Sequence, residues 1–195
     1  RILAAVSAES TVQAAGDAEA ATNAGADGIM VFAPYSWALG ADPRAIVNHH
    51  RGIAGAVAAP LYLFQGSVGS FRLAYTPDVL RALLEIDSLA GIKEGSWEVK
   101  AYECTRRIAR EMRPDVAVMA SGDEHLFPCF LIGSDGSAVS LAAVVPELIV
   151  ALDQRVRAGD FAKALEIHTA LFDFARLVYG APGHMAAARL KACLA

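Results

Sequence analysis

The chain has 195 residues, of which 55% are hydrophobic and 19% charged, and its formal net charge is −4 at pH 7. This composition is typical of a globular protein with a large apolar core and excludes an intrinsically disordered chain. The acidic balance and the scattered basic residues argue against a nucleic-acid partner.

Three widely spaced cysteines form no CxxC pair. That pattern favours reduced thiols of a cytoplasmic protein over a disulfide framework or a zinc site. The longest apolar stretch, AVSLAAVVPELIVAL, is interrupted by Pro146 and Glu147 and is too short to span a bilayer. No signal peptide is visible either, so we expect a cytoplasmic protein without a membrane partner.

Short apolar runs alternate with longer segments of helical periodicity along the chain. We expect strands over residues 2–6, 28–32, 61–65, 89–93, 116–120 and 136–140. We expect helices over residues 9–24, 43–58, 76–86, 96–112 and 124–132, with helical periodicity from residue 146 to the end. Asp42 followed by Pro43 is a typical helix start.

Repeated alternation of strand and helix predicts right-handed crossovers and a parallel sheet. Two architectures fit this pattern: an open doubly wound sheet and a (β/α)8 barrel, from which the six expected strands are two short. No GxGxxG follows the first strand, and the chain has no P-loop. The sequence therefore gives no support to a phosphate-binding doubly wound sheet.

Lys93 lies in the hexapeptide GIKEGS, at the end of the apolar run LAGIK. Lysine is almost never fully buried unless it is paired. One interpretation is a lysine whose head reaches water at the end of a strand. The other is an amine in a pocket, where loss of water favours its neutral, nucleophilic form.

Several segments, in this order and spacing, resemble the dihydrodipicolinate synthase / N-acetylneuraminate lyase superfamily of lysine-dependent aldolases and lyases. The matching segments are AGADGIMVFAPY, GIKEGS, ASGDE, GSDGSAVSLAAVVPEL and AGDFAKALEIH. The resemblance implies a (β/α)8 TIM barrel with a C-terminal helical extension. Residues 1–145 would then run from the family's third strand to its eighth, and residues 146–195 would form the last barrel helix and the C-terminal helices. The first two β/α units, with a loop that usually binds the carboxylate of the keto acid, would be missing from this chain.

The resemblance also implies an activity. Barrel enzymes carry catalytic groups at the carboxyl ends of their strands, and Lys93 ends the fourth expected strand. We expect a lyase or aldolase in which Lys93 forms a Schiff base with pyruvate or another 2-keto acid, for aldol addition, aldol cleavage or dehydration. The family further implies a homodimer or homotetramer, a small-molecule substrate and no cofactor.

Two positions depart from the family pattern. Tyr35 matches a usual tyrosine but is followed by Ser36 instead of a second aromatic residue, so substrate binding and packing against a neighbouring subunit both remain open for it. Phe64 stands where the family commonly has a tyrosine that shuttles protons, and phenylalanine has no hydroxyl. Tyr62 lies on the same face but deeper in the barrel. The alternatives are therefore a non-catalytic keto-acid-binding or structural homologue, and a dehydratase or hydratase-aldolase with another proton relay.

The remaining candidates come from loops at the ends of strands. Gly122, next to Ser121, is expected to line the pocket, and Asp123 either lines it or caps the next helix. The resemblance implies a substrate contact at the backbone carbonyl of Val139. Arg72 is a weaker candidate for binding a carboxylate. The five histidines have no metal-ligand spacing, and we expect no metal site.

Overall fold

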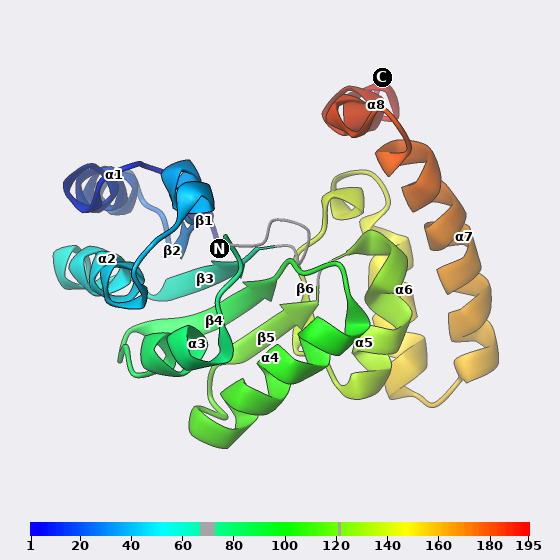
Figure 1. The fold of residues 1–195 in the computed structure, drawn as a ribbon. Helices are drawn as coiled ribbons and strands as arrows, with labels where there is room; N and C mark the ends of the chain where they lie inside the picture. Colours follow the sequence, from blue (N-terminus) through cyan, green and yellow to red (C-terminus); the bar gives the residue numbers. More distant parts are fainter. Residues whose placement is uncertain (67–72, 121) are drawn as a thin grey trace. The chain divides into compact units, whose positions relative to one another are not determined.

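The computed structural model describes residues 1–66, 73–120 and 122–195. It divides into two compact units, residues 1–118 and residues 119–195. Both units contain parallel strands with helices packed against them (Figure 1). The parallel α/β sheet that the sequence predicts is confirmed.

Among the described residues the sheet has six strands, ordered as they follow one another in the chain. The strands are β1 (Leu3–Val6), β2 (Gly28–Val31), β3 (Leu61–Gln65), β4 (Leu89–Glu94), β5 (Ala117–Ala120) and β6 (Gly136–Ser137). The pairs β1–β2, β2–β3, β3–β4 and β5–β6 are parallel. The carboxyl ends of β1 to β4 therefore meet at one edge of the sheet in the first unit.

Helices connect these strands. The α-helices are α1 (Thr11–Asn23), α2 (Pro43–Ala56), α3 (Pro77–Leu84), α4 (Val99–Met112), α5 (Leu126–Ile132), α6 (Pro146–Arg157), α7 (Phe161–Tyr179) and α8 (Ala186–Ala192). Ser10, Asp42 and Thr76 cap the first three, each accepting a hydrogen bond from a backbone amide of the first turn. These caps satisfy amides that the helix itself leaves unpaired.

The two faces of β3 differ in burial. Leu61, Leu63 and Gln65 are buried, whereas Tyr62 and Phe64 between them are partly exposed. Because successive side chains of a strand point to opposite faces, the buried set packs with the apolar helix residues that form the core. Fully buried examples of those helix residues are Ile53, Leu83, Leu84 and Tyr102. The other face of β3 is the one available to a ligand.

Most expected elements are shorter in the structure by one to three residues, and β6 and α4 each differ by three residues at one end. β6 ends at Ser137 instead of residue 140, and a 3-10 helix occupies Ser140–Ala143. Its partner β5 ends at Ala120, whose carbonyl accepts the last ladder bond from the Ala138 amide at 3.1 Å. The helix expected from residue 96 begins at Val99, because the side chain of Ser96 is engaged in a turn before the helix.

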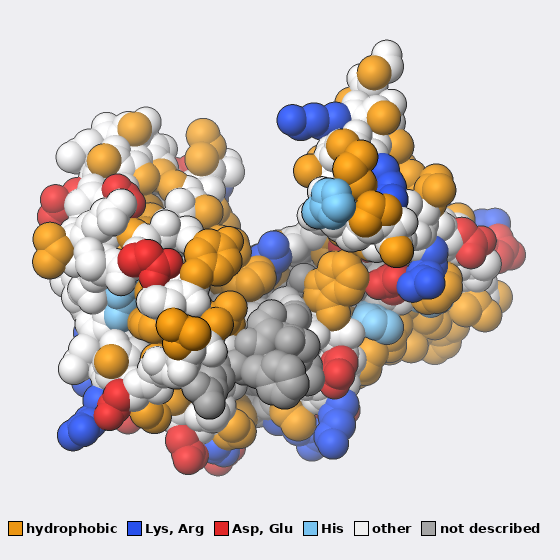
Figure 2. Space-filling model, turned by 45° about the horizontal axis from the view of Figure 1, so that its top comes forward, with side chains coloured by type: hydrophobic (Ala, Val, Ile, Leu, Met, Phe, Trp, Pro, Cys, Tyr) orange, Lys and Arg blue, Asp and Glu red, His pale blue; other side chains and the backbone are white. Residues whose placement is uncertain are grey.

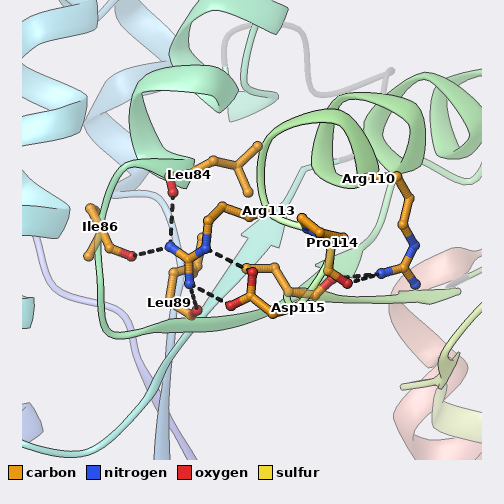
Figure 3. A network of polar contacts seen from close by, with 8 residues as sticks. Leu84, Ile86, Leu89, Arg110, Arg113, Pro114 and Asp115 are labelled. Atoms are coloured by element: carbon orange, nitrogen blue, oxygen red, sulfur yellow. Dashed lines mark hydrogen bonds and ion pairs between the residues drawn. The ribbon is translucent and has the colours of Figure 1, made fainter.

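Arg113 joins two connections at the amino ends of β4 and β5 (Figure 3). Its guanidinium donates to the carbonyls of Leu84, Ile86 and Leu89 at 3.2, 3.3 and 3.4 Å. It also forms a two-pronged ion pair with Asp115, with N–O distances of 3.0 and 2.8 Å. A planar five-donor group can satisfy all of these acceptors at once, so Arg113 fixes the α3–β4 connection against the α4–β5 connection.

On the face drawn in Figure 2, the Lys and Arg side chains of the described residues are scattered among acidic and apolar ones. Within the described ranges, the model contains no helix with the length and apolar character that a membrane span requires.

Candidate functional site

Lys93 lies near the carboxyl end of β4, opposite Phe64 of β3 in the parallel register. The neighbours of Lys93 in the strand, Ile92 and Glu94, are completely buried, whereas Lys93 is partly exposed. Lys93 and Phe64 therefore project from the face of the sheet that the core does not fill. The Lys93 Nζ atom lies 5.1 Å from the centroid of the Phe64 ring, which is within the range of a cation–π contact.

Phe32 completes an aromatic pair with Phe64. The two rings stack with centroids 4.3 Å apart and an angle of 20° between their planes. Phe32 follows β2, and its amide donates to the carbonyl of Val6 at 2.9 Å, which holds the end of β2 against the end of β1. Neighbouring parallel strands thus bring the two rings together from positions 32 residues apart in the sequence.

A cavity of about 350 Å³ opens beside this pair, at the carboxyl ends of β1 to β4. Its volume lies in the usual range for small-molecule sites. The described residues that line it are Ser7, Phe32, Ala33, Tyr35, Phe64, Gly66, Leu73, Gly95 and Trp97. The cavity therefore contains two of the five residues selected from the sequence, Tyr35 and Phe64. Lys93 is not among its lining residues but lies next to Phe64.

Gly95 permits the close packing next to Lys93. A Cβ atom at this position would lie 2.7 Å from the carbonyl oxygen of Gln65 and 3.0 Å from the Phe64 ring. The Gly95 amide donates to that same carbonyl at 2.9 Å. Glycine is thus required by the approach of the β4 turn to the end of β3.

Glu94 is a buried carboxylate that the sequence interpretation did not use. Its Oε2 accepts from the hydroxyl of Ser96 at 2.6 Å and from the Ser96 amide at 3.3 Å. Its Oε1 makes no hydrogen bond of normal geometry with any described residue. Burial raises the pKa of Glu94 to about 7, and the hydrogen bonds from Ser96 only partly offset this. The carboxyl is therefore partly protonated near neutral pH.

Trp97 is a second residue that the sequence interpretation missed. Its backbone φ is 60°, a left-handed conformation that residues other than glycine rarely adopt. The Ser96 hydroxyl bridges across it, accepting from the Glu98 amide at 3.3 Å and lying 3.2 Å from the Glu98 carbonyl. The helical periodicity after residue 98 extends back over Trp97 in the sequence, so only the hydrogen bonds of the turn reveal its conformation.

Tyr35 begins the 3-10 helix Tyr35–Leu39 and is 76% exposed. Its amide donates to the carboxylate of Glu9 at 3.0 Å, and the Ser36 amide donates to the same carboxylate at 3.2 Å. Hydrogen bonds from Ser36 and Tyr35 hold the pKa of Glu9 below its usual value. The start of this short helix is thus fixed to the loop after β1, while the Tyr35 ring stays accessible at the rim of the cavity.

Gly122 and Val139 belong to the second unit. Gly122 has φ 85°, which favours glycine, and its carbonyl accepts from the His125 amide at 2.8 Å. Val139 is extended, and its carbonyl accepts from the Ala142 amide at 3.3 Å in the following 3-10 helix. Ser121 and Arg72 lie outside the described residues.

Asp123 does not cap the helix that follows it. Its carboxylate accepts from the Leu141 amide at 2.9 Å and from the Tyr179 hydroxyl at 3.1 Å. Burial raises the pKa of Asp123, and these hydrogen bonds oppose the effect. Asp123 therefore joins the end of β5 to the segment after β6 and to the end of α7 within the second unit. Across the part of the chain that the structure describes, His, Cys, Asp and Glu side chains form no group of three or more suited to a metal ion.

Comparison with known proteins gives one consistent result. The model of the dihydrodipicolinate synthetase family matches residues 1–191. An uncharacterized DapA-like lyase of Halobacterium salinarum is 34% identical over 165 residues, which are 84% of this chain and 51% of that protein. A probable 2-dehydro-3-deoxy-D-pentonate aldolase of Escherichia coli is 32% identical over 173 residues, 87% of this chain and 56% of that protein.

A solved structure shows the same fold. The crystal structure of YagE, a prophage protein of the dihydrodipicolinic acid synthase family from E. coli K12, in complex with pyruvate, superposes with a TM-score of 0.87 at 24% identity. The match covers 98% of this chain and 63% of YagE. The chain therefore spans about half the length of the curated relatives named above.

Proposed function

Because this chain belongs to the dihydrodipicolinate synthetase family, we propose that the protein is a lyase or aldolase whose Lys93 forms a Schiff base with pyruvate or another 2-keto acid. The observation that carries the proposal is the position of Lys93. Its amine lies near the carboxyl end of a parallel strand, over the Phe64 ring, and Phe64 lines a cavity of about 350 Å³. Parallel α/β barrels place their reacting groups at this edge.

The chemistry follows from the amine. The neutral Lys93 Nζ adds to the C2 carbonyl of the keto acid and expels water, which leaves an iminium cation. The cation accepts the electron pair of a bond to the neighbouring carbon, so that a proton can leave that carbon or a carbon–carbon bond can break. Water then hydrolyses the imine, releases the product and restores the lysine.

Phe64 has a specific part in this scheme. Its π face carries partial negative charge, and the Lys93 nitrogen lies 5.1 Å from the ring centroid. The ring therefore stabilises the positive charge of the iminium, although it can transfer no proton. A proton relay has to come from water or from another group at the cavity.

Trapping of the imine tests the proposal. The full-length protein is incubated with pyruvate and borohydride and then digested, and the modified peptide is identified by mass spectrometry. We expect modification at Lys93, none in Lys93→Arg, and normal modification in Lys100→Arg, which alters an exposed lysine of the neighbouring helix. An unmodified Lys93 with pyruvate and the common 2-keto acids contradicts the proposal.

A second function is favoured by one observation, the absence of a hydroxyl at Phe64. A homologue that binds a keto acid without turnover would still form the trapped imine. Steady-state assays of pyruvate release and of condensation separate the two: an imine without turnover of any tested aldehyde supports the binding protein. We also propose that the protein is a homodimer or homotetramer, which sedimentation velocity measures directly.

A further inference from the structure

Four of the described residues that line the cavity beside Lys93 are aromatic. The stacked rings of Phe32 and Phe64 form part of its wall, and Trp97 and Tyr35 add two further rings. None of the described residues that line it carries a charge. Aromatic rings of this kind bind aromatic groups by offset or edge-to-face packing.

This lining discriminates between classes of aldehyde. Phe32 and Phe64 offer no hydrogen-bonding side-chain atom, so a hydroxyl group placed against their rings loses its water without a replacement. Each such hydroxyl lowers affinity by roughly 5- to 150-fold. A polyhydroxylated aldehyde therefore binds this wall poorly, whereas an aryl group gains from it.

Trp97, which lines the cavity, lies in a turn whose backbone conformation is unfavourable for a residue other than glycine. Its left-handed backbone, with φ 60°, is enclosed by the hydrogen bonds of Ser96 to Glu94 and to Glu98. Conformations of this kind persist where the surrounding structure holds them, and they are concentrated at functional sites. The buried carboxyl of Glu94 thus anchors the turn that brings an indole ring to the same cavity as the two phenylalanines.

We propose that the carbonyl partner of the keto acid is an aryl aldehyde, bound against Phe32, Phe64 and Trp97. This inference rests on the proposed function and names the substrate class of the same site. The product of condensation with pyruvate is a 4-aryl-4-hydroxy-2-oxo acid, and the reverse reaction cleaves it.

The step balances without an oxidant or reductant. The Lys93 imine of pyruvate loses a proton from C3 to give an enamine. The C3 carbon attacks the aldehyde carbon, a carbon–carbon bond forms, and the aldehyde oxygen takes up one proton and becomes a hydroxyl. Water then cleaves the iminium and regenerates the amine of Lys93.

The test compares two aldehydes in the full-length protein. Condensation with pyruvate is measured for benzaldehyde and for D-glyceraldehyde, and the two values of kcat/KM are compared. We expect benzaldehyde to be preferred by at least about tenfold, since a glyceraldehyde hydroxyl placed against the Phe32 or Phe64 ring loses its water without a replacement. Trp97→Ala should raise the KM for benzaldehyde by about 2- to 10-fold and leave the KM for pyruvate unchanged. Trp97→Phe should retain most of the affinity, and Val12→Ala, at an exposed position of α1, should change neither value.

A binding measurement makes the result independent of turnover. Saturation-transfer NMR of the wild-type protein with benzyl alcohol, and with glycerol as reference, reports whether the cavity takes an aryl group. We expect transfer to benzyl alcohol that falls in Trp97→Ala. A preference for D-glyceraldehyde in a protein that forms the imine overturns this inference alone. Failure of imine trapping overturns the proposed function, and the benzyl alcohol signal then decides the aromatic site separately.

Discussion

The Nζ atom of Lys93 lies 5.1 Å from the centre of the Phe64 ring because the two residues are partners in the parallel register of β3 and β4. This contact places a cation, or an iminium formed from it, against the negative face of a ring. The same ring stacks on Phe32 and touches the position of Gly95. Substitutions of Phe64 can therefore distinguish two effects: stabilisation of the positively charged nitrogen by the ring, and proton transfer by a hydroxyl group.

Replacement of Phe64 tests both effects. Phe64→Leu removes the π face and should reduce the trapped imine by about 2- to 5-fold, the value of an exposed cation–π contact. Phe64→Tyr keeps the ring and adds a hydroxyl, and general acid–base help is worth about 10²–10⁴-fold. We therefore expect Phe64→Tyr to raise the rate of condensation or cleavage in steady-state assays. A large loss in that variant would show that the reaction uses another relay and needs an apolar wall here.

The buried carboxyl of Glu94 predicts a pH dependence of stability. Its pKa is about 7 in the folded protein and 4.5 in an unperturbed chain. The folded state keeps its proton where the unfolded state loses it, so this contribution is fully present below pH 4.5 and is lost as the pH rises to about 7. The loss amounts to about 3 kcal/mol. The free energy of unfolding, measured with urea at pH 4.5 and at pH 8, should fall less with rising pH in Glu94→Gln than in the wild type. Glu19→Gln, at an exposed position of α1, should behave like the wild type.

Buried His50 should have the opposite effect on the pH dependence of stability. Its Nδ1 lies 2.9 Å from the Ile46 carbonyl, which can only accept, so Nε2 accepts from the Tyr75 hydroxyl at 3.0 Å. Burial lowers the pKa of His50 to about 4 from 6.5. Its contribution is therefore complete above pH 6.5 and is lost as the pH falls towards 4. Tyr75→Phe leaves Nε2 without this partner and should lower the free energy of unfolding at pH 7 by about 1–3 kcal/mol, measured by urea unfolding. An unchanged midpoint in Tyr75→Phe would contradict the importance of this hydrogen bond.

Arg113 should matter for stability and not for substrate binding. Arg113→Lys retains the charge but cannot reach three carbonyls and Asp115 together. We expect a loss of about 2 kcal/mol in the free energy of unfolding, with KM values unchanged. Arg44→Lys is the matched control, because its ion pair with Asp42 is exposed and is worth less than about 1 kcal/mol. Equal effects of the two substitutions would show that the Arg113 network adds nothing beyond a surface ion pair.

The order and type of the elements could be predicted from the sequence because they depend on local patterns. Apolar runs of about five residues between amphipathic helices indicate buried parallel strands. Asp42 before Pro43 marked the start of α2, which the structure confirms. The sequence predicts that Lys93 ends an apolar strand, and in the structure β4 continues one residue further, to Glu94. The family match of residues 1–191 is consistent with the motifs that carry the resemblance.

The site beyond Lys93 depends on contacts between distant segments, which no local pattern contains. Pairing of β2 with β3 brings Phe32, which follows β2, against Phe64 of β3. Nothing within either segment specifies this ring stack. β6 is shorter than expected because the register pairs Ser137 with Ala120, the last residue of β5. Trp97 follows a strand and precedes a helix, and its left-handed backbone is imposed by hydrogen bonds between Ser96 and its neighbours.

The sequence by itself determined the alternation of elements and the lysine at the strand end, since each is encoded within a few consecutive residues. Only the tertiary structure decided which aromatic rings surround that lysine, because ring positions follow from the register of strands that lie far apart in the chain.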